Sequence, residues 1–339
     1  MRIINIFIFA ILVGSLNAQT SVNPDISVIG QLLGSYAADE IELHGSSVEL
    51  AFQGYVNPFA RVDVYLHKHM DSEPIGVEEA VLSIERGLPL GLALRTGKLR
   101  PDFGKINSLH MHMFPQILLP EPVAQMLGEE KWGSSGIETR WLMPLLWYSN
   151  LSLAYLQEGI STHHHVAVEE EESSPGPAIS GRYSIFFDLG NFSHIETGIS
   201  TYQLVDDADQ KVSGFDLKYK WRPDKYRSLI WESELFYKTA FSELDEGVLE
   251  KHSEVLAGYT LVTYQFKKVW NAGTIFDYSS DLEDLKYTSS GIFMGFSPAE
   301  ESTVFRLFIK GIQHGTEKPQ FLIQTQLLWS LGPHKAHKF

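Results

Sequence analysis

The sequence predicts an all-β protein, a transmembrane antiparallel up-and-down β-barrel that forms a single outer-membrane domain over residues 19–339. Three observations support this fold class. Apolar side chains recur at every second position in many short segments, aromatic residues are numerous (20 Phe, 14 Tyr and 7 Trp), and short and long connections alternate. A membrane barrel is apolar and aromatic outside and polar inside, with short turns at one end and long loops at the other.

The N-terminus has the layout of a secretory signal peptide. Met1 and Arg2 precede an apolar stretch over residues 3–13, and small and polar residues follow up to Gln19. This pattern predicts a signal peptide over residues 1–18, with cleavage after Ala18. The alternative, a membrane-anchoring helix, needs about 20 apolar residues. The chain has no cysteine, which suits a protein of a bacterial envelope better than a disulfide-stapled secreted scaffold.

The charge balance argues against nucleic acid as a partner. There are 27 Lys and Arg against 42 Asp and Glu, a net charge of −15. Binding to phosphate backbones requires a basic face. The expected partners are therefore outer-membrane lipid and small hydrophilic solutes or ions.

The clearest strand pattern is residues 215–221. Phe215, Leu217, Tyr219 and Trp221 share one face, while Asp216, Lys218 and Lys220 share the other. The same reasoning predicts sixteen strands, in order: 25–36, 46–55, 59–67, 76–86, 90–100, 133–142, 147–158, 180–189, 192–202, 211–222, 227–241, 253–266, 270–279, 287–297, 302–313 and 320–331. Weak alternation at 253–266 and 289–298 leaves fourteen strands as the alternative.

The predicted connections alternate in length. Short turns include 57–58, 87–89, 190–191, 222–225 and 298–300. Longer polar loops are expected at 37–45, 68–75, 101–132, 159–179, 203–210, 242–252, 280–286 and 314–319. With the N-terminus inside the cell envelope, every long loop lies outside.

The third long loop, residues 101–132, differs from the others because it contains four prolines and many apolar side chains. A connection of about 30 residues is usually functional or disordered. We expect it to fold into the lumen and form a constriction; the alternative is a lid or subunit-contact loop outside the pore. Its candidate constriction residues are Lys105, His110, His112, Glu121, Glu129 and Glu130.

Strand parity also predicts a set of charges that face the lumen. They are Arg95, Glu138, Arg140, Asp216, Lys218, Lys220, Glu232, Glu234, Arg306 and Lys310. Rings of fixed charge select ions in a pore. Their mixed signs indicate opposed acidic and basic walls, and part of the set is expected to pair across strands.

Two groups of histidines are of the residue type that binds zinc or a similar ion. His163, His164 and His165 precede four glutamates in the fourth long loop, where the plain reading is a solvated loop tip. His110 and His112 would point to the same side of a locally extended chain, as a ligand pair or as ordinary polar contacts with the wall. No other cofactor is expected.

An enzyme is not expected. No Gly-x-Ser-x-Gly nucleophile elbow is present. Carboxylates adjacent in sequence, such as Glu78 and Glu79, are expected on opposite faces of a strand, so they would not act as a pair.

Short motifs add a family resemblance. Residues 94–104 (LRTGKLRPDFG) and 77–82 (VEEAVL) resemble the phosphate-selective porin group. Residues 107–112 (NSLHMH), 127–130 (LGEE) and the C-terminal 331–339 are similar to a poorly characterised family of porin-like outer-membrane proteins, some described beside zinc-regulated receptors. The resemblance implies a passive channel for small hydrophilic solutes or ions, and a homotrimer. Mixed lumen charges argue against phosphate selectivity.

An alternative function stays open at this point. Tyr65, Ile230, Phe236 and Phe308 are also predicted to face inward, and a lumen filled by large side chains would not conduct. The barrel would then be a scaffold whose extracellular loops bind metal ions or a partner.

Overall fold

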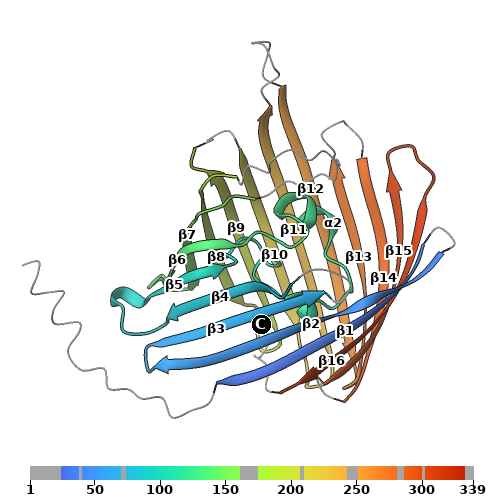
Figure 1. Cartoon of the computed structure of the whole chain (residues 1–339), viewed down its shortest axis with the longest axis horizontal. Helices are drawn as coiled ribbons and strands as arrows, with labels where there is room; N and C mark the ends of the chain where they lie inside the picture. Colours follow the sequence, from blue (N-terminus) through green and yellow to red (C-terminus); the bar gives the residue numbers. More distant parts are fainter. Residues whose placement is uncertain are drawn as a thin grey trace, which may run out of the picture.

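The chain folds into a closed barrel of sixteen antiparallel strands (Figure 1). The computed structural model describes residues 24–37, 40–69, 74–160, 175–206, 210–242, 251–280, 286–299 and 302–332. Each strand pairs with its neighbours in sequence, and β1 pairs with β16 to close the wall. Among the described residues no helix has the length and apolar character needed to cross a membrane.

The first eight strands are β1 (Asp25–Ala37), β2 (Glu40–Asn57), β3 (Ala60–His69), β4 (Gly76–Ile84), β5 (Leu92–Leu99), β6 (Ser134–Leu142), β7 (Tyr148–Leu156) and β8 (Ala178–Asp188). The second eight are β9 (Ser193–Leu204), β10 (Lys211–Trp221), β11 (Ser228–Ser242), β12 (Lys251–Phe266), β13 (Trp270–Ser280), β14 (Lys286–Ala299), β15 (Thr303–His314) and β16 (Gln320–Leu331). The prediction of sixteen strands is confirmed.

The two strands with weak alternation are β12 and β14, and the structure explains the weakness. On β12 the inward side chains of Val255 and Leu261 are buried, while Leu256 on the other face is exposed. On β14 Phe293 is buried between the exposed Ile292 and Met294. Because both faces are apolar here, the two-residue pattern fades although the strand persists.

The first connection differs from the prediction. A long loop was expected at 37–45, but β2 begins at Glu40 and pairs with β1 as far as Ala37. The register of this ladder shifts between Gln31 and Leu33. Such an irregularity interrupts the side-chain alternation, which explains why the pattern did not reveal these strand residues.

The two faces of the wall have different chemistry on most strands. On β10 the exposed Phe215 lies between inward-facing positions, and Asp216 and Lys220 on the inner face are buried. The aromatic and aliphatic side chains exposed on the outer face include Ile199, Trp231, Phe276 and Phe305. A large exposed apolar surface of this kind indicates contact with a membrane or with another protein.

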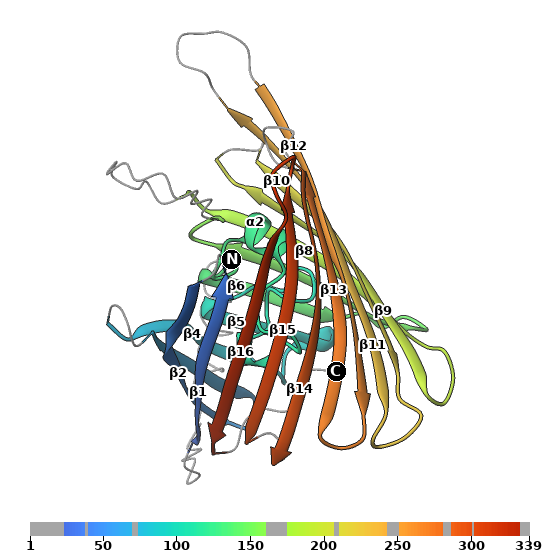
Figure 2. The ribbon, with the colours of Figure 1, turned by 90° about the vertical axis from the view of Figure 1, so that its right-hand side faces the viewer.

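The connection between β5 and β6, residues 100–133, lies inside the barrel, and we call it the lumen loop. It contains the short turn η2 (Met111–Met113) and the helix α2 (Glu121–Leu127), whereas η1 (Pro89–Gly91) lies in a turn of the wall. Figure 2 shows α2 within the ring of strands. Pro122, Val123, Met126 and Leu127 form the buried face of α2, which contacts β11, β12 and β13.

Candidate functional site

The lumen loop is closed at its base by one buried amide. Asn107 Nδ2 donates to the carbonyls of Pro101 and Trp132, each at 3.0 Å, and Asn107 Oδ1 accepts from the Trp132 backbone N–H at 3.0 Å. The indole Nε1 of Trp132 donates to the carbonyl of Glu158. The two ends of the loop are therefore tied together where it leaves the wall.

The lumen loop contacts the inner wall around most of the circumference. Its polar contacts reach wall side chains on at least seven strands, among them Glu49 (β2), Glu79 (β4), Ser152 (β7), Ser200 (β9), Glu234 (β11), Ser279 (β13) and Arg306 (β15). A loop outside the barrel could not reach all of these strands. It therefore crosses the lumen.

A network of five groups fixes the first part of the loop to β5, β6 and β7. Glu138, which is fully buried, accepts from Arg95 at 2.6 Å, from Arg140 at 2.9 Å and from the Asp102 backbone N–H at 2.6 Å. The Asp102 carboxylate accepts from Arg140 at 2.7 Å and from Ser152 at 3.0 Å. Three of these residues, Arg95, Glu138 and Arg140, are among the predicted lumen charges.

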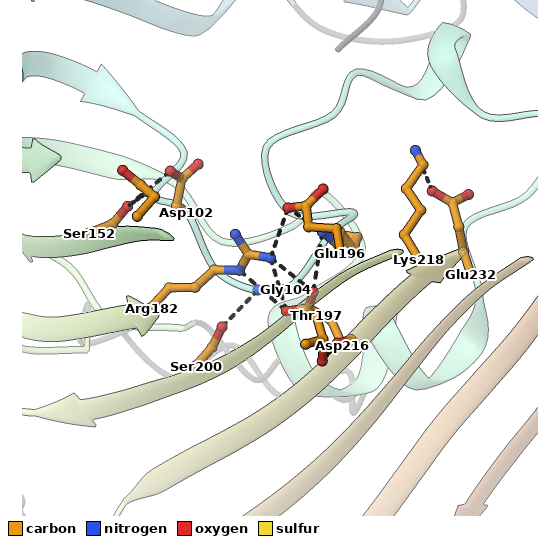
Figure 3. A network of polar contacts seen from close by, with 12 residues as sticks. Asp102, Gly104, Ser152, Arg182, Glu196, Thr197, Ser200, Asp216, Lys218 and Glu232 are labelled. Atoms are coloured by element: carbon orange, nitrogen blue, oxygen red, sulfur yellow. Dashed lines mark hydrogen bonds and ion pairs between the residues drawn. The ribbon is translucent and has the colours of Figure 1, made fainter. Parts of the chain in front are cut away.

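A second network lies on β8, β9 and β10 (Figure 3). Arg182 makes a two-pronged contact with Asp216, with Nη2 2.9 Å from Oδ1 and Nε 3.2 Å from Oδ2. Lys105 of the loop lies 2.5 Å from Glu196 and 3.4 Å from Asp216. Two anions and two cations thus meet in one place. Their mutual attraction offsets part of the free-energy cost of removing each charge from water.

Glu234 supports the turn of the loop after Lys105. It accepts from the Ile106 backbone N–H at 3.0 Å and from the Tyr259 hydroxyl at 2.8 Å. The Gly104 backbone N–H donates to Ser200 at 3.0 Å. The loop backbone at this point is held by side chains of the wall.

The predicted histidine pair lies on the opposite side of the lumen, in what we call the His110 cluster: Glu49, Glu78, Glu79, His110 and His112. His110 Nδ1 is 3.3 Å from Glu49 Oε2 and 3.4 Å from Glu78 Oε2, and its Nε2 is 3.6 Å from Glu79 Oε2. His112 Nδ1 is 3.5 Å from Glu49 Oε2. The two imidazole rings stack with centroids 5.7 Å apart.

The expectation that Glu78 and Glu79 face opposite sides of a strand is wrong. Tyr65 pairs with Glu79 but Leu66 pairs with Val77, so Glu78 is an extra residue on β4 without a partner on β3. A bulge of this kind puts two consecutive residues opposite one and turns both inward. Both carboxylates therefore reach His110.

The surroundings shift the pKa of two loop residues. Burial by itself would lower the pKa of the His110 imidazole, but the carboxylates of Glu49, Glu78 and Glu79 outweigh it and raise that pKa well above its ordinary value. Burial and then the nearby Arg100 lower the pKa of the Lys131 ammonium to about 7. The Lys131 Nζ donates to the carbonyl of Leu109.

The remaining predicted residues are more dispersed. Lys218 and Glu232 pair at 2.8 Å, Lys310 pairs with Asp277 at 3.0 Å, Arg306 donates to Gln326 and to the His112 carbonyl, and Lys220 is buried on the inner face of β10. Glu121, Glu129 and Glu130 are exposed on the loop. His163, His164 and His165 lie outside the described residues.

Sequence reasoning missed several groups that complete these networks. The strand and loop pattern that predicted their partners could also have predicted four of these groups, Asp102, Arg182, Glu196 and Asp277. Glu49 had a signal as well, because it alternates with Val48 and Leu50 along β2. The inward position of Glu78 had no signal in the sequence, since nothing in the sequence marks a bulge.

Apolar packing also joins the lumen loop to the wall. Phe103 of the loop stacks on Phe236 of β11, with ring centroids 6.4 Å apart, and both are fully buried. Val123 and Met126 of α2 and Phe308 of β15 are in the same buried cluster. Of the four large side chains predicted to face inward, Tyr65, Phe236 and Phe308 are buried by packing, whereas Ile230 is partly exposed.

No family model matches the chain. A protein of Aquifex aeolicus described as uncharacterised is 27% identical in an alignment 337 positions long, which covers 86% of this chain and 69% of that protein.

Comparison of the structure is more informative. The anion-selective porin from Comamonas acidovorans superposes with a TM-score of 0.60 at 9% identity, over 91% of this chain and 100% of that one. The outer-membrane channel DcaP of Acinetobacter baumannii gives 0.57 at 10% identity, over 92% and 99%. OpdK of Pseudomonas aeruginosa, an outer-membrane protein, gives 0.54 at 12% identity, over 91% and 99%. The chain therefore has the sixteen-stranded barrel fold of the outer-membrane porins.

Proposed function

We propose that this chain is a passive channel of the outer membrane for small hydrophilic solutes or ions, and that the lumen loop sets its aperture. The observation that carries the proposal is the lumen loop itself. It crosses a closed barrel and is fixed to the wall by charged networks on both sides. Fixed charges at a narrow point determine which ions pass.

The inner charges support a channel of mixed rather than uniformly basic character. Lys218 and Glu232 keep 18% and 16% of their side-chain surface accessible, and Glu196 keeps 26%. Acidic and basic groups both remain in contact with the lumen. The proposed channel therefore has neither the anion selectivity stated in the name of the Comamonas porin nor phosphate selectivity.

The membrane and assembly assignments belong to the same proposal. The exposed apolar outer face fits bilayer hydrocarbon, and residues 1–18 have the features of an export signal. A homotrimer is inferred by analogy with barrels of this fold; one of the similar structures, OmpT of Vibrio cholerae, is described in a trimer form.

The test is single-channel conductance of the refolded chain, residues 19–339, in a planar bilayer. Stable ohmic steps from heat-modifiable, folded protein would support the channel. A second protein with residues 103–131 replaced by a short Gly-Ser linker should give larger steps, because the loop no longer narrows the lumen.

A second function is favoured by the packing of Phe103, Val123, Met126, Phe236 and Phe308, which fills part of the lumen. In that case the barrel is a scaffold and the loop is a plug. The same pair of proteins decides between the two functions. A silent full chain beside a conducting loop-replaced protein would identify a plug, whereas conduction by both identifies a channel with a constriction.

A further inference from the structure

Three side chains of the His110 cluster lie close enough together to hold a metal ion. One ligand atom each from Glu49, Glu78 and His110 lies within 4.8 Å of the other two. The three residues come from β2, the bulge of β4 and the lumen loop. No single element makes the site, and only the folded loop completes it.

The distances support this interpretation. The separations of His110 Nδ1 from Glu49 Oε2 and Glu78 Oε2 are 3.3 and 3.4 Å. An N–H to oxygen hydrogen bond usually spans about 2.7–3.2 Å. Two ligands of a tetrahedral zinc ion at bonds of about 2.0–2.1 Å lie about 3.3–3.4 Å apart. The observed separations match the second arrangement.

The imidazole nitrogen at the centre lacks a hydrogen-bond partner in the part of the chain that the structure describes. His110 is only 3% exposed, and its Nδ1 is among the buried atoms without a partner, as is Glu49 Oε1. Both carboxylate oxygens that face this nitrogen, Glu49 Oε2 and Glu78 Oε2, lie beyond the usual distance of a hydrogen bond from it. A metal ion placed between His110 Nδ1, Glu49 Oε2 and Glu78 Oε2 would give the buried imidazole nitrogen a partner.

The surrounding groups hold the three ligands in position. Arg100 Nη2 contacts the other oxygen of Glu78 at 2.6 Å, and the Arg100 backbone N–H donates to Glu79 Oε1 at 2.9 Å. The far nitrogen of His110 faces Glu79 at 3.6 Å, and Tyr65 packs on the ring with centroids 4.1 Å apart. In metal sites a ligating imidazole commonly directs its other nitrogen at a carboxylate, which fixes the ring.

We propose that Glu49, Glu78 and His110 bind a divalent transition-metal ion of the zinc class, with His112 or water as the fourth ligand. The Nδ1 of His112 lies 3.5 Å from Glu49 Oε2, a similar separation. Mixed imidazole and carboxylate donors favour zinc over magnesium or calcium. The ion would join the lumen loop to β2 and β4. This proposal does not depend on whether the barrel conducts.

The experiment is calorimetric titration of refolded, EDTA-treated protein with Zn²⁺, and with Mg²⁺ and Ca²⁺ as comparison ions. It uses the chain in which His163, His164 and His165 are replaced by serine, because that tract could bind zinc independently. One zinc ion per chain is expected, with no comparable binding of Mg²⁺ or Ca²⁺. X-ray absorption of the loaded protein should show nitrogen and oxygen neighbours only.

Variants locate the ion. His110→Gln and Glu49→Gln should abolish zinc binding at the single site. Glu79→Gln, which acts on the orientation of His110, should lower the zinc affinity about 10–100-fold. His194→Gln, on β9 beside Lys220, is the matched control and should leave zinc binding unchanged. Barrel folding of each variant is verified by heat-modifiable migration.

Two results would overturn the proposal. One is the absence of zinc binding in the folded serine-substituted chain. The other is a one-site isotherm that His110→Gln and Glu49→Gln both leave unchanged. In either case the cluster would be an ion pair between protonated His110 and its carboxylates. Neither result bears on conductance, so the channel proposal is judged separately.

Discussion

At the scale of single residues, Gly104 shows how closely the lumen loop approaches the far wall. Its φ of +58° lies in the left-handed region, and a Cβ built on it would lie 1.9 Å from Glu234 Oε2. Glycine is the residue that adopts this conformation and this approach without a steric penalty. The close contact of the lumen loop with β11 therefore requires glycine at position 104.

Gly104→Ala should therefore destabilise the barrel by about 1–3 kcal/mol, as strained or overpacked positions usually do. Equilibrium unfolding by urea in lipid vesicles would measure the change. Gly54→Ala is the control, because a Cβ there meets Pro24 at an ordinary 3.6 Å and φ is not positive. Equal stability of the two variants would show that the loop is not seated at Gly104.

At the scale of elements, the lumen loop is a unit with its own closure. Asn107 is fully buried and its amide joins Pro101 to Trp132, the two ends of the loop. The loop is not held by apolar packing alone. Opening the closure should free the loop without unfolding the strands.

Asn107→Ala removes three hydrogen bonds of roughly 1 kcal/mol each. Local opening should rise on the order of 100-fold, with proteolysis of the loop accelerated by the same factor. Limited proteolysis followed by mass spectrometry of the cleavage sites would measure it. Gln313→Ala, whose amide donates to the carbonyls of Gly315 and Glu317 in the turn after β15, should leave the rate near that of the unmodified chain. Acceleration by both variants alike would point to general destabilisation instead.

At the scale of the whole molecule, the barrel separates an apolar exterior from a charged interior. Ile199 is 60% exposed on β9, and Leu189 is 58% exposed in the turn that precedes this strand. In a bilayer the first would meet lipid and the second would lie near water. Their similar exposure makes them a matched pair.

Ile199→Lys should destabilise the inserted barrel by about 2–4 kcal/mol if this position lies near the bilayer midplane. Leu189→Lys should change stability by at most about 1 kcal/mol, because charges near the interface cost little. Unfolding from phosphatidylcholine vesicles gives both values. Similar small effects at the two sites would contradict insertion at this depth.

The lumen charges allow a second test at this scale. Glu232→Gln leaves Lys218 unpaired and should shift the reversal potential of the channel toward anion preference, while Lys218→Gln should shift it toward cations. The measurement is the reversal potential under a tenfold salt gradient. Shifts of the same sign, or none from either variant, would show that this pair does not face the permeation path.

The His110 cluster shows what the sequence could and could not predict about the candidate site. His110 and His112 were predicted as a pair because their spacing is two residues, and they do lie together. Their carboxylate partners were not predicted as a set, because Glu49 is more than 60 positions away in sequence and the bulge at Glu78 reverses the parity rule. Local pattern finds groups within an element, whereas contacts across the lumen require the closed barrel.

The sequence by itself predicted sixteen strands, with fourteen as the alternative, and determined their order and the unusual loop, since side-chain alternation and turn residues are local properties of the chain. Only the tertiary structure decided what fills the lumen. Closure of β1 on β16 brings distant strands to face one another, and an inward residue then meets water, a charge or the loop according to its place on the ring. That is why the inner positions Phe236 and Lys218, alike in parity, differ in environment: Phe236 packs against Phe103, while Lys218 pairs with Glu232.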